Sequence, residues 1–369
     1  MLKVLKLKLQ NGYSVSIELP DYLFNIVEVN IKRAILQNRM YPNNVKSDLC
    51  YVCAINQTHL SSEQLEFVKR EICNNKCKLK TPYILQRVTS ICSFNYCDIA
   101  WYLNNVYGIP QVTNSFMLEG SLTHAIDNLL TEYLDNKNNY KRFKELYPDR
   151  DLIQQEILKI IEDELLDKAL ETIEESVPED LIQSTLERMF NTVLEEFAEV
   201  NAYRICHNIE HEGEYHKIVS RKWTELKVVG YYSNYDVNLF LIGHIDKLYR
   251  LNDNTFVIRD VKTTRTLLLS ETEQGSFYDT QLQLGGYKYL LEQFYGVNVN
   301  VIGEIELSRY FQVLPVLCDS KGFVQVCDRL CDFIKNMKMP IGRPRGSLCT
   351  VETCSYFSIC EDRFKKKRL

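Results

Sequence analysis

The residues best suited to chemistry lie in two neighbouring segments, Gly243-His-Ile-Asp246 and Ile258-Arg-Asp-Val-Lys262. Each carboxylate comes at or near the end of an apolar run typical of a strand, so the two converge at one sheet edge if the strands form a hairpin. Paired carboxylates with water suit Mg²⁺ or Mn²⁺. Alternation places Asp260 and Lys262 on one face, where the lysine can orient an attacking water and stabilise charge on a phosphate. The pattern predicts metal-dependent hydrolysis at phosphorus, whereas a bare D-x-K match is more often a surface strand with a salt bridge.

Three further residues fit the same site. Gly120-Ser-Leu-Thr-His124 begins a predicted helix, and an imidazole can complete the ligand set of a metal. Gln283 and Tyr287 are four residues apart in another predicted helix and therefore share one of its faces. Taken alone, His124 would be a helix-terminal or core histidine. Its occurrence together with the two aspartate segments favours the ligand role.

In chain order these segments form the set Gly-x-x-x-His, Gly-x-x-Asp, Asp-x-Lys and Gln-x-x-x-Tyr. The set resembles the RecB-type branch of the PD-(D/E)xK nuclease superfamily. This resemblance implies an α/β fold, with a restriction-endonuclease-like PD-(D/E)xK core on a mixed central sheet. It also implies hydrolysis of DNA phosphodiester bonds that depends on a divalent metal, Mg²⁺ or Mn²⁺.

The resemblance assigns a role to each matched residue. The implied metal ligands are His124, Asp246, Asp260 and the main-chain carbonyl of Val261. Lys262 is then the catalytic lysine, and Gln283 and Tyr287 support the site or hold DNA.

The chain has 13 cysteines, and clustered cysteines in a reducing compartment more often bind metal or act in catalysis than form disulfides. Cys349-x4-Cys354-x5-Cys360 lies in a Gly/Pro-flanked tail and needs a fourth ligand, for which Cys97 ranks first and Cys92 second. This arrangement resembles the iron–sulfur RecB-like nucleases, which include CRISPR-associated RecB-like exonucleases and exonuclease V. The resemblance implies a [4Fe–4S] cluster held by Cys97, Cys349, Cys354 and Cys360. The same four thiolates also suit tetrahedral Zn²⁺.

A second group of cysteines has spacing near that of a zinc ribbon, at Cys50, Cys53, Cys73 and Cys77. The second pair is one residue too long for that pattern. These residues form either an additional Zn²⁺ site or scattered cysteines of an accessory region.

Hydrophobic periodicity predicts the elements that position these residues. Asn11-Gly12 marks the turn of a β-hairpin over residues 1–20. Helices are expected over 116–136, 150–205, 279–295 and 323–337. Strands are expected over 219–229, 237–248 and 255–261, with one or two more over 297–316.

We therefore expect two regions. Residues 1–80 form an N-terminal accessory region with the hairpin, a helix and a cysteine-containing segment. Residues 81–369 form the RecB-like nuclease domain, with a large helical insertion at about 130–215 and an iron–sulfur tail, the C-terminal cysteine cluster, at about 340–369.

Charge and hydropathy indicate the partners. The net charge is −5, from 44 basic and 49 acidic residues. Residues 151–200 hold fifteen acidic and three basic side chains, a net of −12, which leaves +7 elsewhere. The acidic helices are either a solvated face or an arm that docks protein partners. The basic end, 365–368, either contacts phosphates or is a solubilising terminus. No apolar run reaches the ~18 residues of a membrane span, so we expect a soluble, cytoplasmic or otherwise intracellular protein.

The expected function is metal-dependent DNA exonuclease activity, acting on single-stranded DNA ends in repair, recombination or CRISPR adaptation. An endonuclease could use the same residues. The alternative from another class is a catalytically silent iron–sulfur or zinc DNA-binding adaptor. The intact set of Asp246, Asp260 and Lys262 argues against that alternative.

Overall fold

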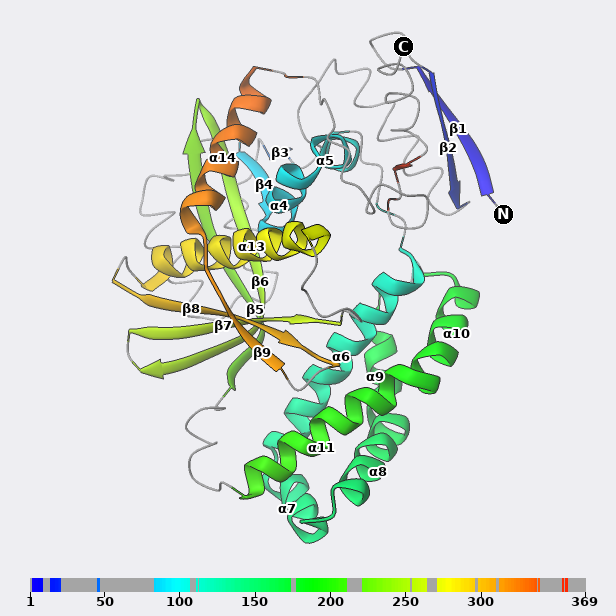
Figure 1. Ribbon diagram of the computed structural model, residues 1–369. Coiled ribbons are helices and arrows are strands. Elements are labelled where there is room, and N and C mark those ends of the chain that lie inside the picture. The colour runs from blue at the N-terminus through cyan, green and yellow to red at the C-terminus, as the bar shows by residue number, and fades with distance from the viewer. Residues whose placement is uncertain are drawn as a thin grey trace.

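The fold comes from a computed structural model (Figure 1). The structure describes residues 2–8, 14–20, 45–46, 83–106, 111, 113–173, 177–210, 221–252, 254–263, 271–295, 298–309, 312–336, 338, 354 and 356–357. None of the helices within these ranges is long and apolar enough to span a membrane.

A mixed sheet forms the centre of the described chain. Its strand order is β3-β4-β6-β7-β8-β9, with β5 paired on β6. The strands are β3 (Val45–Lys46), β4 (Tyr83–Arg87), β5 (Arg221–Asn234), β6 (Val237–Asn252), β7 (Thr255–Lys262), β8 (Asn300–Leu307) and β9 (Gln312–Val316). The pairs β4–β6 and β7–β8 are parallel, and the other pairs are antiparallel. This sheet confirms the predicted α/β class with a mixed central sheet.

The long strand β6 changes partners along its length. Its initial segment, Asn238 to Ile242, pairs with β4, and its final segment, from Lys247 onward, pairs with β7. Asp246 therefore lies where one partner has ended and the next begins. Because Lys247 pairs with Arg259, the same antiparallel register brings Asp246 opposite Asp260 on β7.

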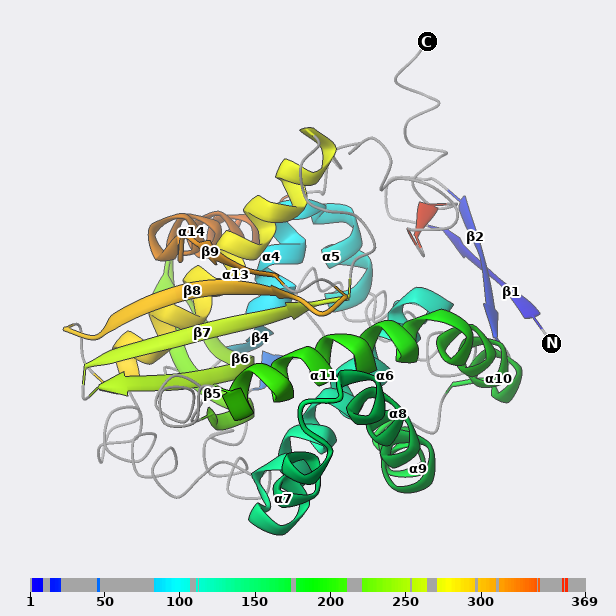
Figure 2. The ribbon, with the colours of Figure 1, turned by 60° about the horizontal axis from the view of Figure 1, so that its bottom comes forward.

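Helices α4 (Val88–Tyr96), α5 (Asp98–Asn105), α13 (Glu271–Tyr295) and α14 (Ser320–Lys335) lie on one side of the sheet, above it in Figure 2. Their apolar side chains share one core with β6, β7 and β8, which includes Ile245, Ile258 and Leu284. Gly243 allows close packing here, because an added Cβ would lie 2.9 Å from Tyr287 Cδ1 and 2.9 Å from Val228 Cγ2. The absence of a side chain at Gly243 thus lets α13 bring Tyr287 against β6.

A block of helices follows α5 in the chain and precedes β5, and it lies on the opposite side, below the sheet in Figure 2. It contains α6 (Ser115–Asp135), α7 (Lys137–Leu146), α8 (Arg150–Ile160), α9 (Leu166–Glu171), α10 (Glu179–Arg188) and α11 (Leu194–Glu210). The block has its own core, with Leu122, Ile157 and Phe197 buried in it. Asn114 and Asp149 cap the first turns of α6 and α8 by accepting backbone N–H bonds.

Most predicted elements are present within the described ranges. Strands β1 (Leu2–Lys8) and β2 (Ser14–Pro20) pair antiparallel, with Leu5 opposite Ile17, which confirms the N-terminal hairpin. Strands β5 and β6 extend beyond the predicted 219–229 and 237–248. They meet in a tight turn whose central residues, Tyr235 and Asp236, have positive φ. The boundary near residue 80, between an accessory region and a nuclease domain, stays a prediction.

Candidate metal centre

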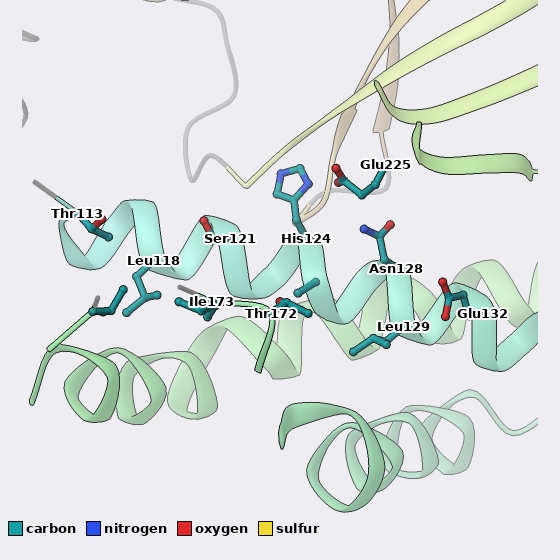
Figure 3. Close-up of a pocket in the computed structure, with 12 residues that line it drawn as sticks. Thr113, Leu118, Ser121, His124, Asn128, Leu129, Glu132, Thr172, Ile173 and Glu225 are labelled. Carbon is teal, nitrogen blue, oxygen red and sulfur yellow. The ribbon is translucent and has the colours of Figure 1, made fainter. Parts of the chain in front are cut away.

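Three side chains from separate elements converge near the point where β6 changes its pairing partner from β4 to β7. His124 comes from α6, Glu225 from β5 and Asp246 from β6, and one ligand atom of each lies within 4.8 Å of the others. His124 Nδ1 is 4.0 Å from Asp246 Oδ2. Figure 3 shows the His124 ring and the Glu225 carboxylate side by side above α6. One imidazole and two carboxylates are a nitrogen and oxygen ligand set suited to a divalent cation.

Glu225 has an unusual backbone conformation for a residue within a strand. Its φ of 48° lies in the left-handed region inside a long strand, where non-glycine residues are uncommon and often functional. The sequence prediction missed this residue. A signal was present, because the turn that pairs Asn234 with Val237 sets a hairpin register that brings Glu225 opposite Asp246.

The second half of the site lies on β7 and α13. Lys262 Nζ is 2.6 Å from Asp260 Oδ2. Gln283 Nε2 donates to Asp260 Oδ1 at 3.0 Å and to the Tyr287 hydroxyl at 3.0 Å. The Val261 N–H donates to Asp246 Oδ2 at 2.8 Å, which joins the two halves. The predicted metal contact of the Val261 carbonyl stays a prediction.

The electrostatics of the site favour binding of a cation. Burial, together with the charge of Asp260, raises the pKa of Asp246 to about 7, although His124 and the Val261 N–H act in the opposite direction. Burial disfavours the charged form of Lys262, but Asp260 and Asp246 outweigh it and raise the lysine pKa. Burial and the same two carboxylates raise the pKa of Tyr287 well above its ordinary range. The tyrosine is therefore a neutral hydrogen-bonding group, and the lysine is a fixed cation.

The predicted site residues thus come together. His124, Asp246, Asp260, Lys262, Gln283 and Tyr287 all belong to one connected set of contacts. Ligand atoms of Glu225, His124 and Asp246 lie within 4.8 Å of one another. Asp260 instead contacts Lys262 and Gln283. The donor set fits the Mg²⁺ or Mn²⁺ that the sequence predicts.

A buried charge network holds α6 in place against the sheet. Lys247, only 1% exposed, lies 2.7 Å from Asp127 Oδ2 on α6 and 2.9 Å from Glu306 Oε1 on β8. Arg204 on α11 is 2.9 Å from the same Glu306 oxygen. Asp127 is three residues beyond His124 and therefore lies near it on the helix surface. The network thereby fixes the helix that supplies the histidine ligand.

Two of the predicted cluster cysteines lie within the described residues. Burial raises the pKa of Cys97, the N–H groups of Ala100 and Ile99 lower it, and Asp98 and then Cys354 raise it further. The two thiols are therefore close enough to interact electrostatically, although more than 250 residues separate them in the chain.

The competing ligand, Cys92, is buried in the sheet core, where its pKa is raised by burial and by Asp279 and Asp260. The remaining predicted metal-binding cysteines lie outside the described residues, namely Cys50, Cys53, Cys73, Cys77, Cys349 and Cys360.

Known proteins resemble this chain to different degrees. A solved structure titled "Crystal structure of SSO0001" is 16% identical, over 57% of this chain and 95% of that chain, with a TM-score of 0.28. No curated protein matches the chain. The family model of the PD-(D/E)XK nuclease superfamily matches residues 88–361, from α4 to the cysteine tail, and spans all four motif segments. The chain therefore belongs to the PD-(D/E)XK nuclease superfamily.

Proposed function

We propose that the protein is a divalent-metal-dependent deoxyribonuclease that removes nucleotides from single-stranded DNA ends. The observation that carries this proposal is the convergence of His124, Glu225 and Asp246 next to the Asp260–Lys262 pair. A nuclease needs anionic and neutral ligands for a cation and a fixed positive charge nearby. The site provides both at one edge of the sheet.

Each side chain has a defined task in this mechanism. His124, Glu225 and Asp246 would hold Mg²⁺ or Mn²⁺, with Asp260 adjoining them. When bound, the cation lowers the pKa of a water molecule and polarises the phosphorus–oxygen bond. The Lys262 ammonium, held by Asp260 at 2.6 Å, orients the water and stabilises negative charge on the phosphate. Gln283 donates hydrogen bonds to both Asp260 and Tyr287, and these bonds hold the Asp260 carboxylate in place beside the metal ligands.

We also propose that Cys97, Cys349, Cys354 and Cys360 hold a [4Fe–4S] cluster. The electrostatic interaction of Cys97 with Cys354 supports this assignment. Zn²⁺ is the alternative metal at the same thiolates. An iron–sulfur nuclease of this type would act in DNA repair, recombination or CRISPR adaptation, with the acidic helices as a surface for protein partners.

The decisive experiment is cleavage of end-labelled single-stranded DNA by the purified protein in Mn²⁺. The Asp260→Ala variant should lose at least about a hundredfold in kcat, because Lys262 loses its partner and the site loses a carboxylate, while DNA binding is retained. The matched control is Asp135→Ala, at the exposed end of α6, which should cut like the parent. Equal cutting by Asp260→Ala and the parent would overturn the assignment.

The metal dependence supplies an independent measurement. Glu225→Gln keeps the size of the side chain but removes its charge, so the Mn²⁺ concentration for half-maximal activity should rise about tenfold or more. A parent protein that binds DNA without cutting it in any divalent metal would instead support the silent adaptor.

A further inference from the structure

A groove begins at the metal centre and runs along α6. Its volume is about 610 Å³, within the usual ~300–1,000 Å³ range of ligand sites. His124 and Glu225 line the groove as well as the metal centre. Ser121, Ala125 and Asn128 follow on the same face of α6, since residues three and four apart are neighbours on a helix. Figure 3 shows the groove between α6 and the segment that carries Thr172 and Ile173.

The lining of this groove is unsuited to phosphate. Among the described residues that line it, none is lysine or arginine, and two, Glu132 and Glu225, carry carboxylates. Nucleic-acid phosphates are bound by cationic side chains and backbone N–H groups. A duplex presents its phosphates outward, so a wall of this kind would repel it.

The same lining suits the bases of an unpaired strand. Leu129 and Ile173 offer apolar surface, and Ser121, Asn128 and Thr172 offer hydroxyl and amide groups. Proteins read exposed bases by this combination, with apolar contact to the faces and hydrogen bonds to the edges. Because His124 and Glu225 line both the groove and the metal centre, a strand whose phosphate lies at the metal centre can place an adjoining base in the groove.

We infer that this groove is the subsite for unpaired nucleobases next to the scissile phosphate. The inference rests on the proposed nuclease function and specifies its substrate, a single strand held partly through its bases. Specificity for unpaired DNA then arises from the neutral and acidic wall of the groove, and the charge of the phosphate is met only at the metal centre and Lys262.

The test compares two strands of equal length and charge, an oligothymidylate and its abasic counterpart, both fluorescently labelled. Binding is measured by anisotropy in an Asp260→Asn background, so that the strand stays intact. The oligothymidylate should bind about tenfold more tightly than the abasic strand, given typical contributions of one contacted base. Equal affinity for the two strands would overturn the inference without depending on any groove variant.

Two variants test whether the preference for the base-containing strand arises in this groove. Ser121→Trp fills the groove and should remove the advantage of the base-containing strand while leaving the abasic affinity unchanged. Ser184→Trp is the matched control, because Ser184 is also exposed on a helix and also donates to a carbonyl of its own helix. A loss of affinity by Ser121→Trp for both strands alike would contradict the inference. Absence of cutting by the parent would instead count against the nuclease function itself.

Discussion

At the scale of single residues, the site brings several carboxylates close together. Asp246 and Asp260 face each other across β6 and β7, and Glu225 adds a third carboxylate beside them. Lys262 neutralises Asp260, which leaves Asp246 with the imidazole of His124 and one backbone N–H. A buried carboxylate with so little compensation is readily protonated, and this property can be measured.

The first prediction concerns the pH dependence of metal-free protein. The folded-state pKa of Asp246 is raised from 3.8 to about 7, so between these values the folded state holds a proton that the unfolded state has lost. Asp246 should therefore lower the free energy of unfolding as pH rises through this window, by up to about 1.4 kcal/mol per pH unit, with no further change above about pH 7.

Urea unfolding in the presence of a chelator, repeated across this pH window, measures the contribution of Asp246 to the free energy of unfolding. Asp246→Asn carries no titrating group, so the difference in stability between parent and variant should grow with pH. Parallel curves for the two proteins would contradict the raised pKa. Added Mn²⁺ should reverse the trend, since the bound form requires the ionised carboxylate.

At the scale of elements, the position of α6 decides whether there is a site at all. His124 and Asp127 lie one turn apart on this helix, and they contact Asp246 and Lys247, which are consecutive on β6. Consecutive residues of a strand point to opposite faces, so the two contacts fix both the height and the rotation of the helix at the sheet. The buried Lys247 thus helps to position His124.

The second prediction follows from this arrangement. Lys247→Met removes the buried cation that Asp127 and Glu306 share, while Glu306 keeps Arg204 and Arg259. The free energy of unfolding should therefore fall by about 3 kcal/mol, the lower end for a broken buried ion pair. The comparison is Lys335→Met, because Lys335 pairs with the exposed Asp236 and its loss should cost at most about 1 kcal/mol. A Lys247→Met protein as stable as the parent would show that the network does not hold α6. Because Lys247 positions α6, Lys247→Met should also weaken Mn²⁺ binding. Lys247→Arg keeps the charge and should restore much of that Mn²⁺ affinity.

At the scale of the whole molecule, two hydrophobic cores are joined by polar contacts around the site. The sheet core and the core of the helical block are separate clusters, and the buried charges of Lys247 and Glu306, together with the half-buried Arg204, link them. The thiols of Cys97, at the start of α5, and of Cys354, in the C-terminal tail, lie within electrostatic range of each other. Closing a loop of about 250 residues costs chain entropy, which bonds to a metal can offset.

The third prediction concerns that connection. Protein purified without oxygen should contain iron and acid-labile sulfide, and Cys97→Ser should lose both and become more susceptible to protease in the C-terminal tail. Cys206→Ser, in the helical block, serves as the control and should retain its iron. Stoichiometric zinc without iron would refute the cluster assignment in favour of a tetrahedral zinc site.

Patterns in the sequence predicted β5 to β9, most of the helical block and the chemical identity of most site residues. They did not predict β4, α4 or α5. Period-two and helical patterns report which face of an element is buried, and Asp246, Asp260, Lys262 and Gln283 stand at spacings that the local geometry of strands and helices fixes. The register of β6 against β7 was likewise accessible, because Asn254 lies in a short connection between them.

Contacts between residues of different elements became known from the three-dimensional structure. The hairpin register places Glu225 opposite Asp246, but its approach to His124 depends on where α6 packs. Lys247 is buried because α6 and β8 both supply a carboxylate. The groove along α6 likewise needs a segment about fifty residues further along the chain for its second wall. Local periodicity is a property of neighbours in the chain, whereas ligand sets and clefts depend on packing between elements, which no local pattern encodes.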